Sequence, residues 1–259
     1  MTRAAARVRL LRGSVLPLLL LSAWEVGSHS GQLDPRILPS VECVGQTALR
    51  ELVDGNLIYH LEVSLGRDLA GFASGAALGI ALGALLGISR LADRVVMPSF
   101  NAVRQIAVLA WIPLIALWFG FGDGAKVVFI ALAALTPAVV NTYEGCRSTA
   151  TQLLEVGTVL RFSRWQFISR LFLPAAMPSI LVGVRLALIA SWVASVGAEY
   201  FMTLGPGIGG LIIAGRERFQ MDLVLLGMVL LGLVGFLLNQ VAALLEARLL
   251  RGRPARQEP

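Results

Sequence analysis

Few side chains in this sequence could carry out catalytic chemistry. Its 259 residues include two histidines, two cysteines and a single lysine. A metal site normally needs three or four His, Cys or carboxylate ligands, and neither His29 nor His60 has an HxxxH or CxxC spacing near it. We therefore expect both histidines to be surface or interface residues, and we expect no metal site and no catalytic residue.

The single lysine bears on whether the chain could hydrolyse ATP at a P-loop. That motif needs a lysine followed by serine or threonine, so that the ammonium and the hydroxyl contact phosphate and magnesium together. Lys126 is followed by Val127. The sequence therefore predicts that this chain has no Walker A site and holds no nucleotide cofactor of its own.

The elements that must position these residues have the composition of a membrane protein. Hydrophobic residues make up 56% of the chain, charged residues 15%, and the mean hydropathy is +0.76. Soluble domains carry about a quarter charged residues, so this composition excludes a soluble enzyme, a disordered chain and a disulfide scaffold. A spanning helix needs about 20 apolar residues, and the charge-poor windows predict an all-α polytopic protein with one domain over residues 1–259. We expect about six spans, at residues 10–27, 69–88, 104–122, 126–144, 178–202 and 222–246.

The distribution of basic residues predicts the orientation of these spans. The first segment follows four arginines, as a signal peptide would, but no small-x-small cleavage site follows it, so we expect it to be retained. Fourteen basic residues then fall on segments at the side of the two termini, and six fall on the opposite side. This positive-inside bias predicts that both termini lie in the cytoplasm.

The segment over residues 28–68 would then lie on the outer side of the membrane. Ser40 can cap a helix that starts at Val41, and the apolar spacing that follows predicts an amphipathic helix at the outer surface. Cys43 falls in this segment and Cys146 falls at the inner face, so no disulfide within the chain is expected.

Small residues recur along the second expected span. Five glycines follow one another at intervals of four residues: Gly71, Gly75, Gly79, Gly83 and Gly87. Residues i and i+4 lie on one face of a helix, so these glycines form a stripe that lets another helix backbone approach closely. We predict a helix-packing surface; a face that lines a substrate path is the alternative.

A patterned loop over residues 145–175 separates the fourth and fifth expected spans and would lie in the cytoplasm. The loop is too polar to span a membrane, and its apolar residues recur at helical spacing. Ser163 can cap a helix that runs to Leu171, with Trp165 on its apolar face, and Pro174 is expected to end that helix. A helix-turn-helix at this surface has the shape of a docking element for a soluble partner.

This loop resembles the EAA loop of permease subunits of bacterial ABC importers. Glu155 matches the glutamate of that motif, Val156 and Gly157 replace its two alanines, and Leu173-Pro174 match its Leu-Pro at the expected spacing. Further stretches are similar to permeases of the sulfonate, nitrate and taurine type, so that the resemblance covers roughly residues 14–250. These stretches are residues 60–72, 110–120 and 196–209.

Arg161 is the main departure from the motif, which has glycine at this place. Glycine can take a positive φ and so end the first loop helix. Arginine adopts that backbone conformation only at an energetic cost. Two interpretations follow. The turn has shifted by a residue and coupling survives, or this subunit couples poorly or has a specialised partner.

The resemblance implies the fold of a type I ABC importer permease and a set of partners. Two permease subunits, here expected to be a homodimer, would form the pathway for a small anionic solute: an aliphatic sulfonate, taurine or nitrate. A thiamine-precursor pyrimidine would also suit the subfamily. Separate ABC ATP-binding subunits would hold ATP–Mg and dock on the loop, and a periplasmic substrate-binding protein would deliver the solute. The chain would lie in the bacterial cytoplasmic (inner) membrane, with no nucleic-acid partner. The implied coupling residues are Glu155, Val156, Gly157, Arg161, Ser163, Trp165, Leu173 and Pro174.

Three ionisable residues lie in or beside apolar stretches, where a charge is costly and often functional. Arg104 stands at the start of the third expected span, Arg185 lies within the fifth, and Glu199 lies near the end of the fifth. Each could instead lie at an interface with its charged head in water. We keep all three as candidate pathway residues, with Glu199 better suited to holding helices or a gate.

The main rival to an ABC permease is an ion-coupled secondary transporter. Such a protein would show inverted repeats, broken helices and carboxylates near the bilayer midplane. The sequence shows neither a convincing internal repeat nor a pair of midplane carboxylates. The ABC permease is therefore the favoured function.

Overall fold

The computed structural model describes residues 15–16, 19, 21–29, 34, 37–148, 162–167, 170, 172–202 and 205–250. All regular elements in this part of the chain are helical, which confirms the predicted all-α membrane fold. Residues 21–29 are helical. The elements with described bounds that follow are α2 (Val41–Val53), α3 (Asn56–Ile88), α4 (Arg90–Val103), the 3₁₀ helix η1 (Val108–Trp111), α5 (Ile112–Phe119), α6 (Asp123–Arg147), α8 (Arg164–Phe167), α9 (Leu173–Phe201), α10 (Ile208–Glu217) and α11 (Met221–Leu249).

Four of these helices are long and apolar enough to cross a membrane: α3, α6, α9 and α11. A fifth crossing is formed if α4 and the η1–α5 segment count together, although the two parts are bent by 90°. The expected span 104–122 is therefore not one straight helix. Its first residues, 104–107, form the bend itself, and the 3₁₀ helix η1 then leads into α5, where Pro113 lies in the first turn and costs no hydrogen bond. The expected first span lies partly outside the described residues.

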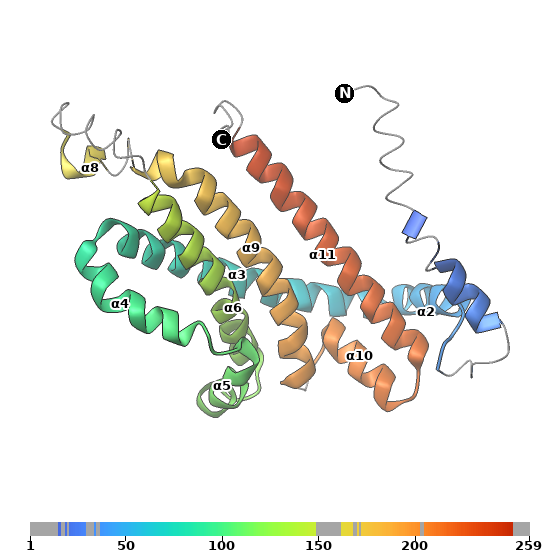
Figure 1. The fold of residues 1–259 in the computed structure, drawn as a ribbon. Helices are drawn as coiled ribbons and strands as arrows, with labels where there is room; N and C mark the ends of the chain where they lie inside the picture. Colours follow the sequence, from blue (N-terminus) through green and yellow to red (C-terminus); the bar gives the residue numbers. More distant parts are fainter. Residues whose placement is uncertain are drawn as a thin grey trace, which may run out of the picture.

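The core of the bundle is a stack in which α6 packs against both α3 and α9 (Figure 1). We call the end where α3 and α6 begin and α9 ends the Glu199 end. The opposite end, where α6 stops and α9 starts, is the loop end. All five glycines of the stripe on α3 face α6, and a Cβ added at any of them would lie within 2.6 Å of an α6 atom. At Gly75 the added Cβ would lie 2.2 Å from the carbonyl oxygen of Ala131.

The short helices at the Glu199 end are tied to this stack by caps and side chains. Ser40 accepts a hydrogen bond from the backbone N–H of Cys43 at 3.3 Å, which confirms the predicted cap of the helix that starts at Val41. Thr47 Oγ1 of α2 donates to Asp222 Oδ2 of α11. Gly55 follows α2 with φ of 76° and begins the turn into α3, a conformation that glycine adopts without strain.

Candidate functional site

Glu199 lies at the centre of a buried polar network at the Glu199 end. Glu199 is only 4% exposed. One carboxylate oxygen accepts from Ser64 Oγ at 2.7 Å and from Arg67 Nη1 at 3.1 Å, and the other accepts from the backbone N–H of Gly209 at 2.8 Å. These three donors come from two segments of the chain, so the carboxylate joins α9 to α3 and to the first turn of α10.

Arg67 extends the network from α3 to α6. Its Nη2 lies 2.6 Å from Asp123 Oδ1, in the first turn of α6, and its Nη1 donates to the carbonyl of Pro206 at 2.7 Å. Arg67 is 6% exposed and Asp123 is 69% exposed, so the guanidinium is held between one buried carboxylate and one in contact with solvent. Lys126, at 1% exposure, places a second cation in the same region. Buried ions of this kind need partners of opposite charge to offset their desolvation.

The chain around Gly207 wraps closely over the Glu199 carboxylate. Gly207 has φ of 150°, and a Cβ there would lie 2.5 Å from the carboxylate carbon. The backbone N–H of Gly207 donates to His60 Nδ1 at 2.8 Å, and the next N–H, of Ile208, donates to Ser64 Oγ at 2.9 Å. The network is therefore a clamp that holds the entry to α10 against α3, and its groups are engaged with one another rather than aimed at a reactant.

Sequence reasoning singled out Glu199 but assigned no role to its partners Ser64 and Arg67. A signal was present, because His60, Ser64 and Arg67 stand at positions i, i+4 and i+7 and share one face of a helix. That face carries polar groups just before the apolar part of α3, where the hydrophobic window alone placed a loop. The structure begins α3 at Asn56 and so brings all three onto the helix.

The other two candidate pathway residues lie elsewhere. Arg104 is exposed and caps the C-terminal end of α4 at the bend. Arg185 contacts α11, where its Nε donates to Asn239 Oδ1 at 3.0 Å and its Nη1 lies 3.5 Å from Glu246 Oε2. Arg104 lies at the bend after α4, Arg185 lies against α11, and Glu199 lies against α3 and α10, so the structure does not gather the three into one site.

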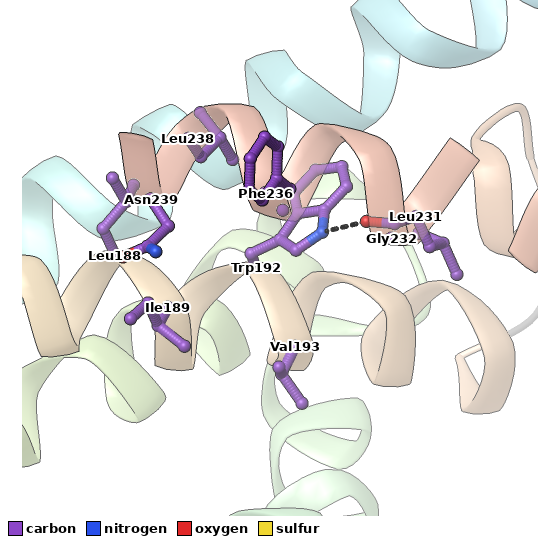
Figure 2. A pocket seen from close by; sticks show the side chains of 10 residues that line it. Leu188, Ile189, Trp192, Val193, Leu231, Gly232, Phe236, Leu238 and Asn239 are labelled. Atoms are coloured by element: carbon purple, nitrogen blue, oxygen red, sulfur yellow. Dashed lines mark hydrogen bonds between the residues drawn. The ribbon is translucent and has the colours of Figure 1, made fainter. Parts of the chain in front are cut away.

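A groove of about 290 Å³ runs between α9 and α11 beside Arg185 (Figure 2). Apolar side chains line most of it, and Trp192 crosses it to donate its indole N–H to the carbonyl of Leu231 at 3.0 Å. Asn239, the partner of Arg185, lies at one end. The groove holds no cluster of reactive side chains, and the described residues contain no group of three His, Cys, Asp or Glu that could hold a metal.

Most of the predicted coupling loop lies outside the described residues, including Glu155, Val156, Gly157 and Arg161. Its second half is described in part. Ser163 Oγ accepts from the N–H of Gln166 at 3.3 Å, and the N–H of Ser163 donates to Gln166 Oε1 at 3.0 Å. This reciprocal pair is a capping box, and it confirms that a helix, α8, begins after Ser163.

Among the neighbouring residues of that loop, Pro174 lies in a different place from the one expected. Trp165 of α8 is 75% exposed and so presents a large apolar surface outside the bundle. Leu173 is the first residue of α9, and Pro174 lies in the first turn of that helix. Pro174 therefore belongs to the start of the next helix rather than to the end of the loop helix, in the position where proline costs no hydrogen bond.

Known proteins resemble this chain in both sequence and fold. The family described as binding-protein-dependent transport system inner membrane component matches residues 75–251. The aliphatic sulfonates transport permease protein SsuC of Bacillus subtilis is 36% identical over 94% of this chain and 88% of its own length. The bicarbonate transport system permease protein CmpB of Synechococcus elongatus is 32% identical over 93% of this chain and 91% of its own. In fold, the chain is similar to a chain of the MetNI methionine ABC transporter in an inward-facing conformation, with a TM-score of 0.66 at 19% identity over 74% of this chain and 95% of that one.

Proposed function

From the finding that this chain belongs to the family of binding-protein-dependent transport system inner membrane components, we propose which solute it carries, which partners drive it and how it lies in the membrane. The chain is the membrane-spanning permease subunit of an ABC importer, and the subunit itself is not an enzyme. The observation that carries this function is the family match over residues 75–251 together with similarity along more than nine tenths of the chain.

The energy for transport comes from a partner chain. Lys126 is the only lysine and has no serine or threonine after it, so the sequence offers no P-loop for ATP. ATP and magnesium would be held by a separate ABC ATP-binding subunit, which docks on the loop around Glu155. A periplasmic binding protein would deliver the solute, and a second copy of this chain would complete the pathway as a homodimer.

The solute is a small anion of the sulfonate or nitrate type. The names of the relatives support this class, since they refer to aliphatic sulfonates and to bicarbonate. The clamp does not itself offer a vacant anion site, because Arg67 is engaged by Glu199 and Asp123. Glu199 therefore serves to hold the helices, Arg104 and Arg185 remain the candidate pathway residues, and the binding protein selects the solute.

The experiment that tests this function is reconstitution with an affinity-tagged chain. The wild-type permease should co-purify with an ATPase that has a Walker A motif, and transport in liposomes should need ATP, the ATPase and the binding protein. Glu155→Ala should lower transport about tenfold or more, because truncating a central docking residue costs about 2 kcal/mol or more. Glu144→Ala, an exposed residue on the last turns of α6, is the matched control and should transport normally.

Transport by the purified chain alone, driven by an ion gradient, would contradict the ABC mechanism and favour the secondary transporter. Equal transport by the Glu155→Ala and Glu144→Ala variants would leave the ABC mechanism standing but would move the docking site away from Glu155.

Both termini would lie in the cytoplasm of a bacterium, with Cys43 on the outer side. The two cysteines allow a direct check, since Cys43 is exposed and Cys146 is buried. In intact cells whose outer membrane has been permeabilised, a membrane-impermeant maleimide should label the wild-type chain, and Cys43→Ser should remove the label. Cys146→Ser is the control and should label as the wild type does. Labelling of Cys43 only after the inner membrane is broken would reverse the orientation.

A further inference from the structure

Helix α4 is attached to the bundle in an unusual way. None of its residues is buried, although α3, α6 and α9 each bury nine or more. At its start, Ser89 follows directly on α3 and caps α4 by accepting from the N–H of Ala92 at 3.3 Å. Apolar packing therefore does little to fix α4 within the chain, and its position depends on specific side-chain contacts.

Such contacts are found in the first turn of α4, where Asp93 bridges to the last turns of α6. Asp93 Oδ1 accepts from the Tyr143 hydroxyl at 2.8 Å, and Asp93 Oδ2 lies 2.6 Å from Arg147 Nη1. Arg147 also donates to the Tyr143 hydroxyl, and its guanidinium carbon lies 5.5 Å from the centre of the Tyr143 ring. Tyr143 and Arg147 are four residues apart on one face of α6, so both reach the same carboxylate. We call these three residues the clasp.

The end of α6 that carries the clasp is also held tightly on its other sides. A Cβ on Gly87 of α3 would lie 2.4 Å from Cys146 Cβ, and a Cβ on Gly145 would lie 2.6 Å from Ser179 Cβ of α9. The last turn of α6 therefore has little room to move relative to α3 or α9. Arg147 is the final residue of α6, directly before the loop that contains Glu155. This turn is therefore one of the two places where that loop joins the bundle, the other being the start of α9.

The far end of the bent pair is held by the core. Ile115 of α5 is 3% exposed and packs in one cluster with Phe129 of α6 and with Ala198 of α9. Ala198 is the neighbour of Glu199. The bent pair thus runs from the clasp at the loop end to the clamp at the Glu199 end, along the outside of the stack (Figure 1).

We propose that Asp93 is a positioning residue for transport, which passes the displacement of the coupling loop through Arg147 and Tyr143 to the bent pair α4–α5. This inference rests on the proposed function, because it assumes that an ATPase acts on the loop. The clasp links the last turn of α6, on which the ATPase acts through the loop, to the bent pair α4–α5. The first half of that pair, α4, has no buried residue. A permease without the clasp binds its ATPase but does not convert ATP hydrolysis into movement of α4 and α5.

The test compares Asp93→Asn, Tyr143→Phe and Arg147→Gln in liposomes with the ATPase and the binding protein. Each variant should co-purify with the ATPase as the wild type does and keep basal ATP hydrolysis. Transport per ATP hydrolysed should fall about two- to thirty-fold, the range expected when a coupling contact is removed. The exposed Arg94→Gln, one residue from Asp93, is the matched control and should leave this ratio unchanged.

Exchanging the charges separates positioning from a local loss of stability. The double variant Asp93→Arg with Arg147→Asp should recover at least half of the transport per ATP that either single exchange loses. Wild-type transport per ATP in Asp93→Asn and Arg147→Gln, with the complex intact, would overturn the inference. So would a loss that the charge exchange does not restore while the thermal stability of the variants stays that of the wild type. Failure of every version, wild type included, to co-purify with an ATPase would instead count against the proposed function.

Discussion

Alanine at Gly75 is expected to disrupt the packing of α3 on α6 and to destabilise the folded chain by about 3 kcal/mol. Its new Cβ would lie 2.2 Å from the carbonyl oxygen and 2.9 Å from the Cα of Ala131. These are backbone atoms and cannot rotate away, so the helices must separate, which places the cost at the upper end of the usual 1–3 kcal/mol for overpacking. Separation would also loosen the contacts of the flanking Gly71 and Gly79, where a Cβ would lie 2.5 and 2.6 Å from side-chain atoms of α6.

Gly66 provides a matched control on the same helix. It is exposed, and a Cβ there would have no atom within 4 Å. Gly66→Ala should therefore stabilise the chain by about 0.5–1 kcal/mol, because alanine loses less backbone entropy in a helix. The measurement is thermal unfolding of the detergent-purified chain, with the folded yield from membranes. Equal stability of the two alanine variants would show that α3 and α6 do not approach at Gly75.

Glu199→Gln is the second change with a large expected effect. Glutamine keeps the size of the side chain but removes the charge that faces Arg67. Its NH2 group replaces one of the two acceptor oxygens, so either Ser64 or Gly209 loses its acceptor. Removing one partner of a buried ion pair typically costs about 3–5 kcal/mol, since the other charge is left without compensation. The exposed Asp123 offsets part of this loss. We expect the unfolding temperature to fall by roughly 10 °C and the segment around Gly207 to become open to protease.

Two further variants make the result specific to the ion pair. Glu217→Gln removes an exposed carboxylate of α10 and should leave the unfolding temperature within about 1–2 °C of the wild type. Replacing both charges, with Arg67→Met and Glu199→Leu, should recover part of the stability, because an apolar pair avoids the desolvation of two ions. An unfolding temperature of Glu199→Gln equal to that of the wild type would contradict the clamp.

Local chemistry could be predicted from the sequence wherever a residue acts on its neighbours in the chain. The caps at Ser40 and Ser163 were predictable because a hydroxyl reaches the N–H groups two or three residues later whatever the tertiary fold. The apolar windows predicted where long helices lie, because the bilayer demands about 20 apolar residues in a row. The spacing of the glycines on α3 predicted a close helix contact, because residues four apart lie on the same face of a helix.

The expected boundaries of the second and third spans differ from the structure for a physical reason. A hydrophobic window stops at polar residues, so it began the second expected span only at residue 69 and left Arg67 in the preceding segment. In the structure α3 continues through this polar turn because Glu199 compensates the charge of Arg67 at 3.1 Å. The window likewise could not reveal the 90° bend before α5, because the charged residues of α4 (Arg90, Asp93 and Arg94) kept that arm outside the expected span.

The sequence by itself determined that this chain is a helical membrane protein with no P-loop motif, since composition, hydrophobic runs and the residue after its single lysine are properties of the chain alone. Only the tertiary structure decided which partners those residues meet. Glu199 and Arg67 lie 132 residues apart, and Asp93 and Arg147 lie 54 apart. Contacts at such separations depend on how α3, α4, α6 and α9 pack, and helical periodicity specifies the face of each helix but not the neighbour against which it packs.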